Sequence, residues 1–371
     1  MNLKKMKYLI LITIVFIPLY APAQDCNQTA LLQKPGTWKE SSGGLSGVAA
    51  ADLAKEKKVV AAIHSMVKSK YSPRGVNANY NGGYQSPQSN MPGNGYSYSI
   101  IPLNFYCDGK TVKEASGTST HFSISANMFD AEIYDPAQGD RLLAEGFNVM
   151  NDMPIEKDGY WYFKDIDASL GFGITGKTST WLITYDGKLP FAYVTKKEFL
   201  EKRKINLSNA RLSSVSASTD VLKRIEIEKG YKEAEYKNDP EKLKRYMKMD
   251  YLSTKERYEK LIADNDKEYK PAFEKIEAQL KMPPNELTKL AIVKQDPNDY
   301  LSYLFTDDED PFGKILIKPN SGYFNNKLPK SSPQFFWIYV RGSHQEPIAT
   351  QFMTDIIKAI DFAVLKNMLG K

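Results

Sequence analysis

Histidine and cysteine are scarce in this sequence of 371 residues, which contains three histidines and two cysteines. None of them follows the ligand spacing of a structural zinc site or of an HExxH metalloprotease. The GxSxG motif of a nucleophile elbow is absent as well. The sequence therefore gives no strong catalytic signature, and we expect neither a metal nor a cofactor.

Long apolar runs are also lacking, apart from one run over residues 8–20. Three lysines precede this run, and an Ala-Pro-Ala sequence at 21–23 follows it. Basic, apolar and small residues in this order predict a secretory signal peptide over residues 1–23. We therefore expect an exported protein, periplasmic or extracellular, with no integral membrane span after cleavage.

An excess of one charge sign is missing too. The formal net charge is +6, and three of the lysines that contribute to it belong to the predicted signal peptide. So mild a charge does not favour a nucleic-acid partner. In an oxidising compartment an isolated cysteine pair usually forms a disulfide, so we predict a Cys26–Cys107 bond.

The clearest pattern in the chain lies between residues 159 and 204. Two aromatic strands, at 160–163 and 181–185, are joined by a glycine-rich turn, and Thr195 with Glu198 predicts a capping box at the start of a helix. The turn contains a GxGxxG sequence at 171–176. Because a strand and not a helix follows it, we interpret it as a hairpin connection and not as a dinucleotide site.

Hydrophobic periodicity predicts helices over Ala50–Lys70 and Pro347–Leu369, and a long charged helical pair between them. The expected fold is α+β, a mainly antiparallel sheet packed with N- and C-terminal helices plus a projecting antiparallel helical hairpin. The predicted units are a sheet domain over 24–205, the hairpin over 206–286, and a final segment over 287–371. This last segment either completes the sheet domain or forms a second lobe.

The first predicted helix carries an apolar stripe of Leu53, Val60, Ile63 and Val67. Its Lys-Glu-Lys-Lys sequence at 55–58 is expected on the solvent side. His64 lies beside the apolar stripe, which favours a partly buried structural histidine.

Residues 74–96 are rich in Asn, Gly, Ser and Tyr and lack periodicity, which predicts a mobile loop. Tyr80, Tyr84 and Tyr96 within it form a candidate binding surface, because tyrosine rings among amides can stack on sugar rings. The alternative is a flexible loop without a ligand.

Other candidate residues are dispersed through the chain. An acidic run at 307–310 could hold calcium or remain an empty surface cluster. His121 and His344 would indicate catalysis if either met a carboxylate and a hydroxyl in one hollow. Candidate paired carboxylates for polymer hydrolysis are Asp130, Glu132, Asp135, Glu156 and Asp165.

Two segments carry a resemblance. Residues 187–201, GKLPFAYVTKKEFLE, and residues 319–340, PNSGYFNNKLPKSSPQFFWIYV, resemble uncharacterised secreted proteins of Bacteroidota-type bacteria. These segments cover about a tenth of the chain. The resemblance implies export and no known activity.

Three functions remain open from the sequence. The favoured hypothesis is a non-catalytic envelope or secreted protein that binds a protein or polysaccharide partner or supports an assembly. The first alternative is a hydrolase of envelope or extracellular polymers. The second is a small-ligand carrier with a cavity lined by Tyr160, Tyr162 or Trp181.

Overall fold

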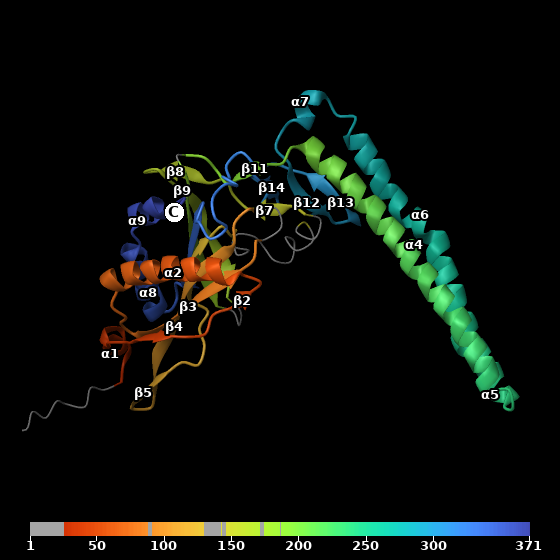
Figure 1. Cartoon of the computed structure of the whole chain (residues 1–371), viewed down its shortest axis with the longest axis horizontal. Coiled ribbons are helices and arrows are strands. Elements are labelled where there is room, and N and C mark those ends of the chain that lie inside the picture. The colour runs from red at the N-terminus through yellow and green to blue at the C-terminus, as the bar shows by residue number, and fades with distance from the viewer. Residues whose placement is uncertain (1–25, 88–90, 130–141, 143–145, 171–173, 186) are drawn as a thin grey trace, which may run out of the picture.

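The computed structural model describes residues 26–87, 91–129, 142, 146–170, 174–185 and 187–371. The predicted signal peptide therefore lies outside the described residues. The fold is α+β, with a body of two sheets and helices from which a long helical hairpin projects (Figure 1). No helix in the described part of the chain is long and apolar enough to cross a membrane.

The larger sheet has ten strands in the order β1-β3-β4-β6-β15-β10-β9-β8, with β2 paired to β3 and β5 to β4. All pairs are antiparallel except those of β1 and β2 with β3. The strands are β1 (Trp38–Glu40), β2 (Leu45–Ser46), β3 (Val76–Gln85), β4 (Gly95–Asp108), β5 (Thr111–Glu114), β6 (His121–Ala126), β8 (Ile155–Lys157), β9 (Tyr160–Ser169), β10 (Thr175–Ile183) and β15 (Phe336–Ser343).

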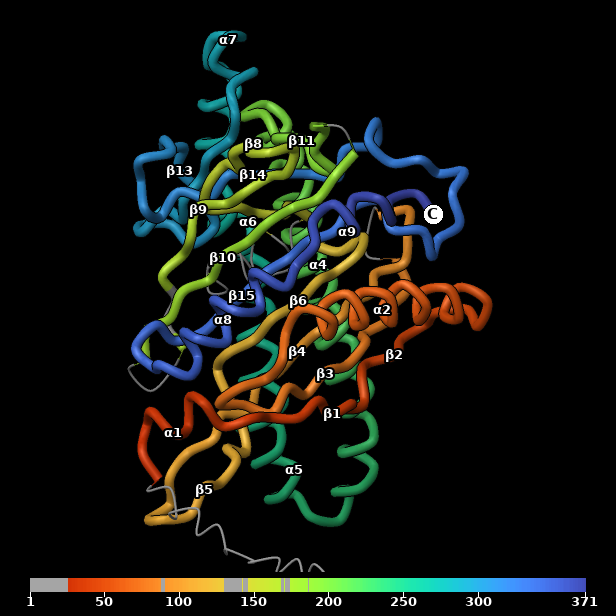
Figure 2. The backbone as a smooth tube through the Cα atoms, turned by 90° about the vertical axis from the view of Figure 1, so that its left-hand side faces the viewer, coloured from red at the N-terminus to blue at the C-terminus, as the bar shows by residue number. Residues whose placement is uncertain are grey.

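Helices cover one face of this sheet, as Figure 2 shows for α2 (Ala50–Lys70), α8 (Pro347–Ala359) and α9 (Phe362–Met368). A short helix, α1 (Gln28–Gln33), precedes β1. Phe336, Ile338 and Val340 of β15 join the core under the helices. Because side chains alternate along a strand, Trp337 and Tyr339 enter the core on the opposite face.

A smaller sheet packs on that opposite face. Its order is β11-β14-β12-β13, with β7 also paired to β14. Ile292, Ile315 and Ile317 of this sheet share a core with Trp337 and Phe163 of the larger one. The strands are β7 (Asn148–Met150), β11 (Phe191–Tyr193), β12 (Ile292–Asp296), β13 (Asp299–Phe305) and β14 (Lys314–Pro319). The final segment therefore serves both sheets, since β15 lies in the first and β12–β14 in the second.

The hairpin consists of α4 (Lys196–Glu235) and α6 (Ser253–Gln279), joined at the tip by α5 (Pro240–Tyr246) and a π-helical turn, Met247–Leu252. The Thr195 capping box is confirmed at the start of α4. A third core holds the base of the hairpin against the smaller sheet. Farther out, the two helices are joined by ion pairs such as Arg211 with Asp266, 3.0 Å apart. A short helix, α7 (Pro284–Leu287), leads back to β12.

Three predictions about these elements are wrong. The mobile loop expected over 74–96 contains the ten residues of strand β3, which pairs with β4 along its whole length. The strand has glycines and asparagines where a sequence pattern of alternating apolar residues would have indicated it. The predicted boundary at 206 falls inside α4, because no glycine or proline follows Thr195 until Gly230. The closing helix is two helices, because Ile360 is extended and the Asp361 side chain caps α9.

Candidate functional site

The predicted disulfide is confirmed. Cys26 and Cys107 are bonded, with their Cα atoms 5.7 Å apart. The bond joins the segment just before α1 to the end of β4, across a sequence separation of 81 residues. The N-terminal end of the described chain is therefore fixed to the larger sheet.

The three tyrosines proposed as a binding surface differ in burial. Tyr96 is buried, and its hydroxyl donates a hydrogen bond to the Ser331 carbonyl at 3.0 Å. Tyr80 and Tyr84 are partly buried against the core beneath the helices. The prediction is therefore wrong for Tyr96, which lies in the core, whereas a binding role for the partly exposed Tyr80 and Tyr84 stays a prediction.

The histidine of α2 is partly buried, as expected. The His64 ring stacks on Tyr80 at a centroid distance of 3.8 Å, and its Nδ1 lies 3.0 Å from the Tyr98 hydroxyl. Burial and the nearby Lys68 charge lower the pKa of His64. His121 Nδ1 forms a hydrogen bond with the Tyr339 hydroxyl. The third histidine, His344, is exposed in the turn after β15.

The same helix buries a carboxylate that the sequence placed in solvent. Glu56 is fully buried and accepts a hydrogen bond from Asn94 Nδ2 at 2.6 Å. Burial raises its pKa, and this effect outweighs the Asn94 hydrogen bond, which lowers the pKa. The expectation of a solvated residue is wrong because the larger sheet and the loop before β4 cover this side of α2.

The candidate hydrolytic acids are only partly within the described residues. Asp130, Glu132 and Asp135 lie outside them, and Glu156 is exposed on β8. Burial raises the pKa of Asp165. Hydrogen bonds from Lys177, Ser179 and Tyr162 lower the pKa by more than burial raises it, so the net shift is downward. Asp165 is thus an ion-paired carboxylate, which does not resemble a protonated general acid.

The acidic run at 307–310 is partly neutralised by its surroundings. Asp310 accepts hydrogen bonds from Lys294 Nζ at 2.6 Å and from Thr306 Oγ1 at 2.8 Å. The Lys294 contact and the Phe312 backbone N–H lower the pKa of Asp310 to about 2. Among the described residues there is no group of three or more His, Cys, Asp or Glu side chains suited to a metal ion.

The aromatic residues proposed to line a cavity are packing residues of the body. Tyr160 and Trp181 contact Phe362 of α9 at ring-centroid distances of 5.0 and 6.2 Å. Tyr162 lies against Trp181. These rings join α9 to the larger sheet.

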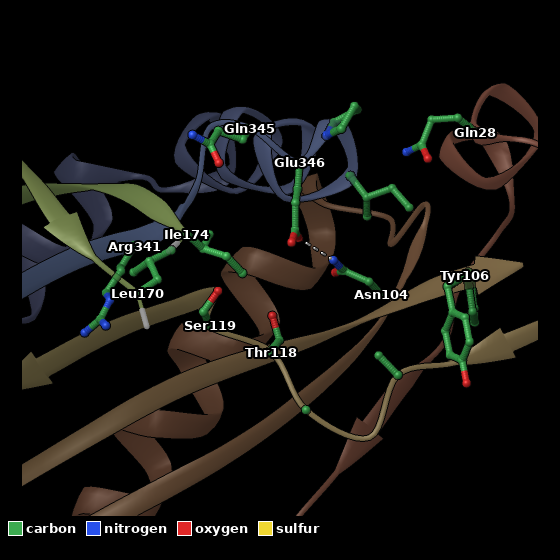
Figure 3. Close-up of a pocket in the computed structure, with 15 residues that line it drawn as sticks. Gln28, Asn104, Tyr106, Thr118, Ser119, Leu170, Ile174, Arg341, Gln345 and Glu346 are labelled. Carbon is green, nitrogen blue, oxygen red and sulfur yellow. Dashed lines mark hydrogen bonds between the residues drawn. The ribbon is translucent and has the colours of Figure 1, made fainter. Parts of the chain in front are cut away.

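A pocket of about 720 Å³ opens elsewhere, at the end of the larger sheet (Figure 3). Five stretches of chain line it: α1, the end of β4, the loop before β6, the β9–β10 hairpin, and the junction of β15 with α8. Its polar lining residues are Gln28, Asn104, Tyr106, Thr118, Ser119, Arg341, Gln345 and Glu346. Its volume falls in the range typical of small-molecule sites.

Asn104 and Glu346 face each other in the pocket (Figure 3), where Asn104 Nδ2 donates a hydrogen bond to Glu346 Oε2 at 3.3 Å. The carboxylate does not cap α8, although Glu346 is the N-cap residue. The Asn104 Oδ1 atom is buried and has no hydrogen-bond partner within the described structure. Sequence reasoning missed this site because its residues come from distant segments and share no motif.

The outer part of the hairpin is a second candidate surface. Ile205, Leu212, Ile227 and Tyr231 of α4 are more than half exposed, and Tyr231, at 73%, is the most exposed large apolar side chain in the described chain. At 3.6 residues per turn these four positions share one side of the helix. The buried residues Leu200 and Leu207 fall on the opposite side. We call these four residues the outward face of α4.

Comparison with known proteins adds no relative to this description. No protein-family model, no curated protein and no solved structure matches the chain.

Proposed function

We propose that this chain is an exported, non-catalytic protein that binds a protein partner of the cell envelope through its helical hairpin. Export is supported by the signal-like sequence at 1–23 and is compatible with the Cys26–Cys107 disulfide. The single observation that carries the binding proposal is the outward face of α4, which exposes large apolar side chains on an element that projects from the body (Figure 1).

The chemistry of the hairpin favours a protein over other partners. Acidic and basic residues, such as Asp220, Lys223 and Arg224, both lie around the outward face of α4, so the surface lacks the single-sign field that nucleic acid would select. Exposed Ile, Leu and Tyr side chains between charged ones match the composition of protein interfaces, where tyrosine is enriched. An amphipathic partner surface would cover the apolar side chains and leave the charges at the rim.

A cross-linking experiment in the producing cell tests this proposal. The full-length protein and the double variant Ile227→Glu/Tyr231→Glu are expressed at equal levels, cross-linked, purified and analysed by mass spectrometry. The wild type is expected to capture one reproducible envelope protein, and the double variant is expected to lose it. Circular dichroism checks that the variant keeps its helix content.

The matched control is Ile155→Glu, which makes the same kind of change at a residue of β8 that is 66% exposed. It should capture the partner as the wild type does. Capture by the double variant at the wild-type level, or equal loss in both variants, contradicts a role for the hairpin. Turnover of an envelope polymer by the purified protein would favour the hydrolase alternative instead.

A further inference from the structure

We propose that the pocket between β4 and the start of α8 binds a small, neutral, hydroxyl-rich ligand of the saccharide class. This site is separate from the hairpin, so it can exist whether or not the hairpin binds a protein. The argument rests on the hydrogen-bonding groups of the lining, its charge balance, its apolar wall and its rigidity.

Asn104 and Glu346, the hydrogen-bonded pair in the pocket, favour a ligand that carries hydrogen-bond donors. Glu346 receives one hydrogen bond from Asn104, and a carboxylate can accept several. The Asn104 Oδ1 atom is a buried acceptor without a partner in the described structure. Because that atom is shielded from solvent, the acceptor of the pair that a ligand hydroxyl can reach is the partly buried Glu346 carboxylate, which Asn104 positions.

The charge of the lining argues against an ionic ligand. Among the lining residues that the structure describes, Glu346 and Arg341 have charged side chains, and their signs are opposite. A cationic ligand is attracted by Glu346 but repelled by Arg341, and an anionic ligand is attracted by Arg341 but repelled by Glu346. A neutral hydroxyl can donate to a carboxylate and accept from an amide, and neither of the two charges repels it.

The remaining lining gives a saccharide an apolar contact as well. Leu170, Ile174 and Ile348 contribute aliphatic side chains to the pocket. Tyr106, 45% exposed, lies at the rim away from Arg341 (Figure 3). A sugar ring presents C–H groups on its faces and hydroxyls at its edge, which matches an apolar wall beside planar polar side chains.

The walls of the pocket are held in place before any ligand binds. The disulfide joins Cys26, close to Gln28, with Cys107, next to Tyr106. Gln345 Nε2 donates to Thr175 Oγ1 at 3.0 Å, which connects the start of α8 to β10. Gln351 Nε2 donates to the Leu32 carbonyl at 3.1 Å, which connects α8 to α1. A rigid site loses little entropy on binding, which favours affinity for a small ligand.

The test titrates the purified, disulfide-bonded protein with glucose, maltose, cellobiose and N-acetylglucosamine, and with glucosamine and glucuronate as charged comparators. Binding is followed by saturation-transfer NMR and calorimetry. At least one neutral sugar is expected to bind, and both charged comparators should bind more weakly. Glu346→Gln should weaken that binding by about tenfold or more, because it removes hydrogen bonds to a charged acceptor.

Asn104→Ala provides a second variant, and Glu156→Gln on β8 is the matched control for the loss of one carboxylate. Asn104→Ala should weaken binding and Glu156→Gln should leave it unchanged, with unfolding curves checking that each variant is folded. The proposal is overturned if no neutral sugar binds, if a charged comparator binds best, or if Glu346→Gln and Asn104→Ala bind as the wild type does.

Discussion

The two-sheet body and the hairpin differ in how much of their apolar side-chain surface they bury. Strands at the centre of the body are buried on both faces, as β15 is between the helices and the smaller sheet. The hairpin, by contrast, buries one narrow side of each helix and leaves large apolar side chains in solvent. Apolar burial is the main favourable contribution to folding, so we expect the body to provide most of the free energy of unfolding. The hairpin is free to present a surface because it is not needed to form the main core.

The largest expected effect is truncation of a ring in the body. Phe336 is fully buried on β15, and Phe336→Ala should lower the free energy of unfolding by about 3–5 kcal/mol because it leaves a cavity. The matched change in the hairpin is Leu261→Ala at a residue that is 47% exposed, which should cost less than about 0.5 kcal/mol. Urea unfolding of both variants measures the difference. Similar losses of unfolding free energy in the two variants would contradict the expectation that the body provides most of the stability.

Removal of the disulfide should have the next largest effect. The double variant Cys26→Ser/Cys107→Ser releases a loop of 81 residues, for which chain entropy gives a stabilisation of roughly 4.5 kcal/mol as an upper figure. We expect a loss of about 2–4 kcal/mol in urea unfolding monitored by tryptophan fluorescence. The pocket proposal adds that sugar binding should weaken in this variant even where it remains folded. Wild-type affinity in the double variant would show that the disulfide does not shape the pocket.

The buried Glu56 should make the stability of the body depend on pH. Because its folded-state pKa is raised from 4.5, the folded protein binds this proton more tightly than the unfolded chain does. Its contribution to stability is present below pH 4.5 and is lost as the pH rises through the raised value. Glu56→Gln cannot lose a proton, so its stability relative to the wild type should increase from pH 4.5 toward neutrality.

Thermal unfolding of the wild type and Glu56→Gln at several pH values measures this difference. The comparison between the two proteins removes the effects of other carboxylates. Asp52, Tyr84 and Tyr96 are the titratable groups whose charge interacts with Glu56. A constant difference across the pH range would show that Glu56 is not the source.

The smallest expected effect belongs to the hairpin surface. Arg211 and Asp266 form an exposed ion pair, with Asp266 at 79% side-chain exposure. Asp266→Asn should change the free energy of unfolding by less than about 1 kcal/mol, and added salt should reduce even that. A double-mutant cycle with Arg211→Gln measures the interaction free energy of the Arg211–Asp266 ion pair. A coupling well above that figure would mean that ion pairs, and not the base of the hairpin, hold α4 and α6 together.

Local patterns in the sequence predicted many of the elements correctly. The Thr195–Glu198 capping box starts α4, and the helical periodicity after Ala49 marks α2 with its predicted bounds. These signals were readable because the groups that form them lie within a few residues of one another. The strand at 76–85 was missed for the same reason, since its Asn and Gly residues carry no local signal and it is ordered by pairing with β4.

The candidate sites were less predictable than the fold. The tyrosines of β3 and β4 were expected at the surface, yet Tyr96 lies in the core because of the register between these strands. Glu56 has charged neighbours in sequence, whereas its hydrogen-bond partner in the folded protein, Asn94, lies 38 residues away. The pocket around Asn104 and Glu346 brings together residues separated by 242 positions.

The sequence by itself determined the α+β composition, the cysteine pair and the charged helical arm. The composition and the arm follow from residue types and short spacings within single elements, and the cysteine pair follows because the sequence has two cysteines. The tertiary structure alone decided that β15 lies between β6 and β10, that a second sheet covers the larger one, and that a pocket opens near the disulfide. These features depend on which distant strands pair and in which register, and that choice is made by burial of the whole core.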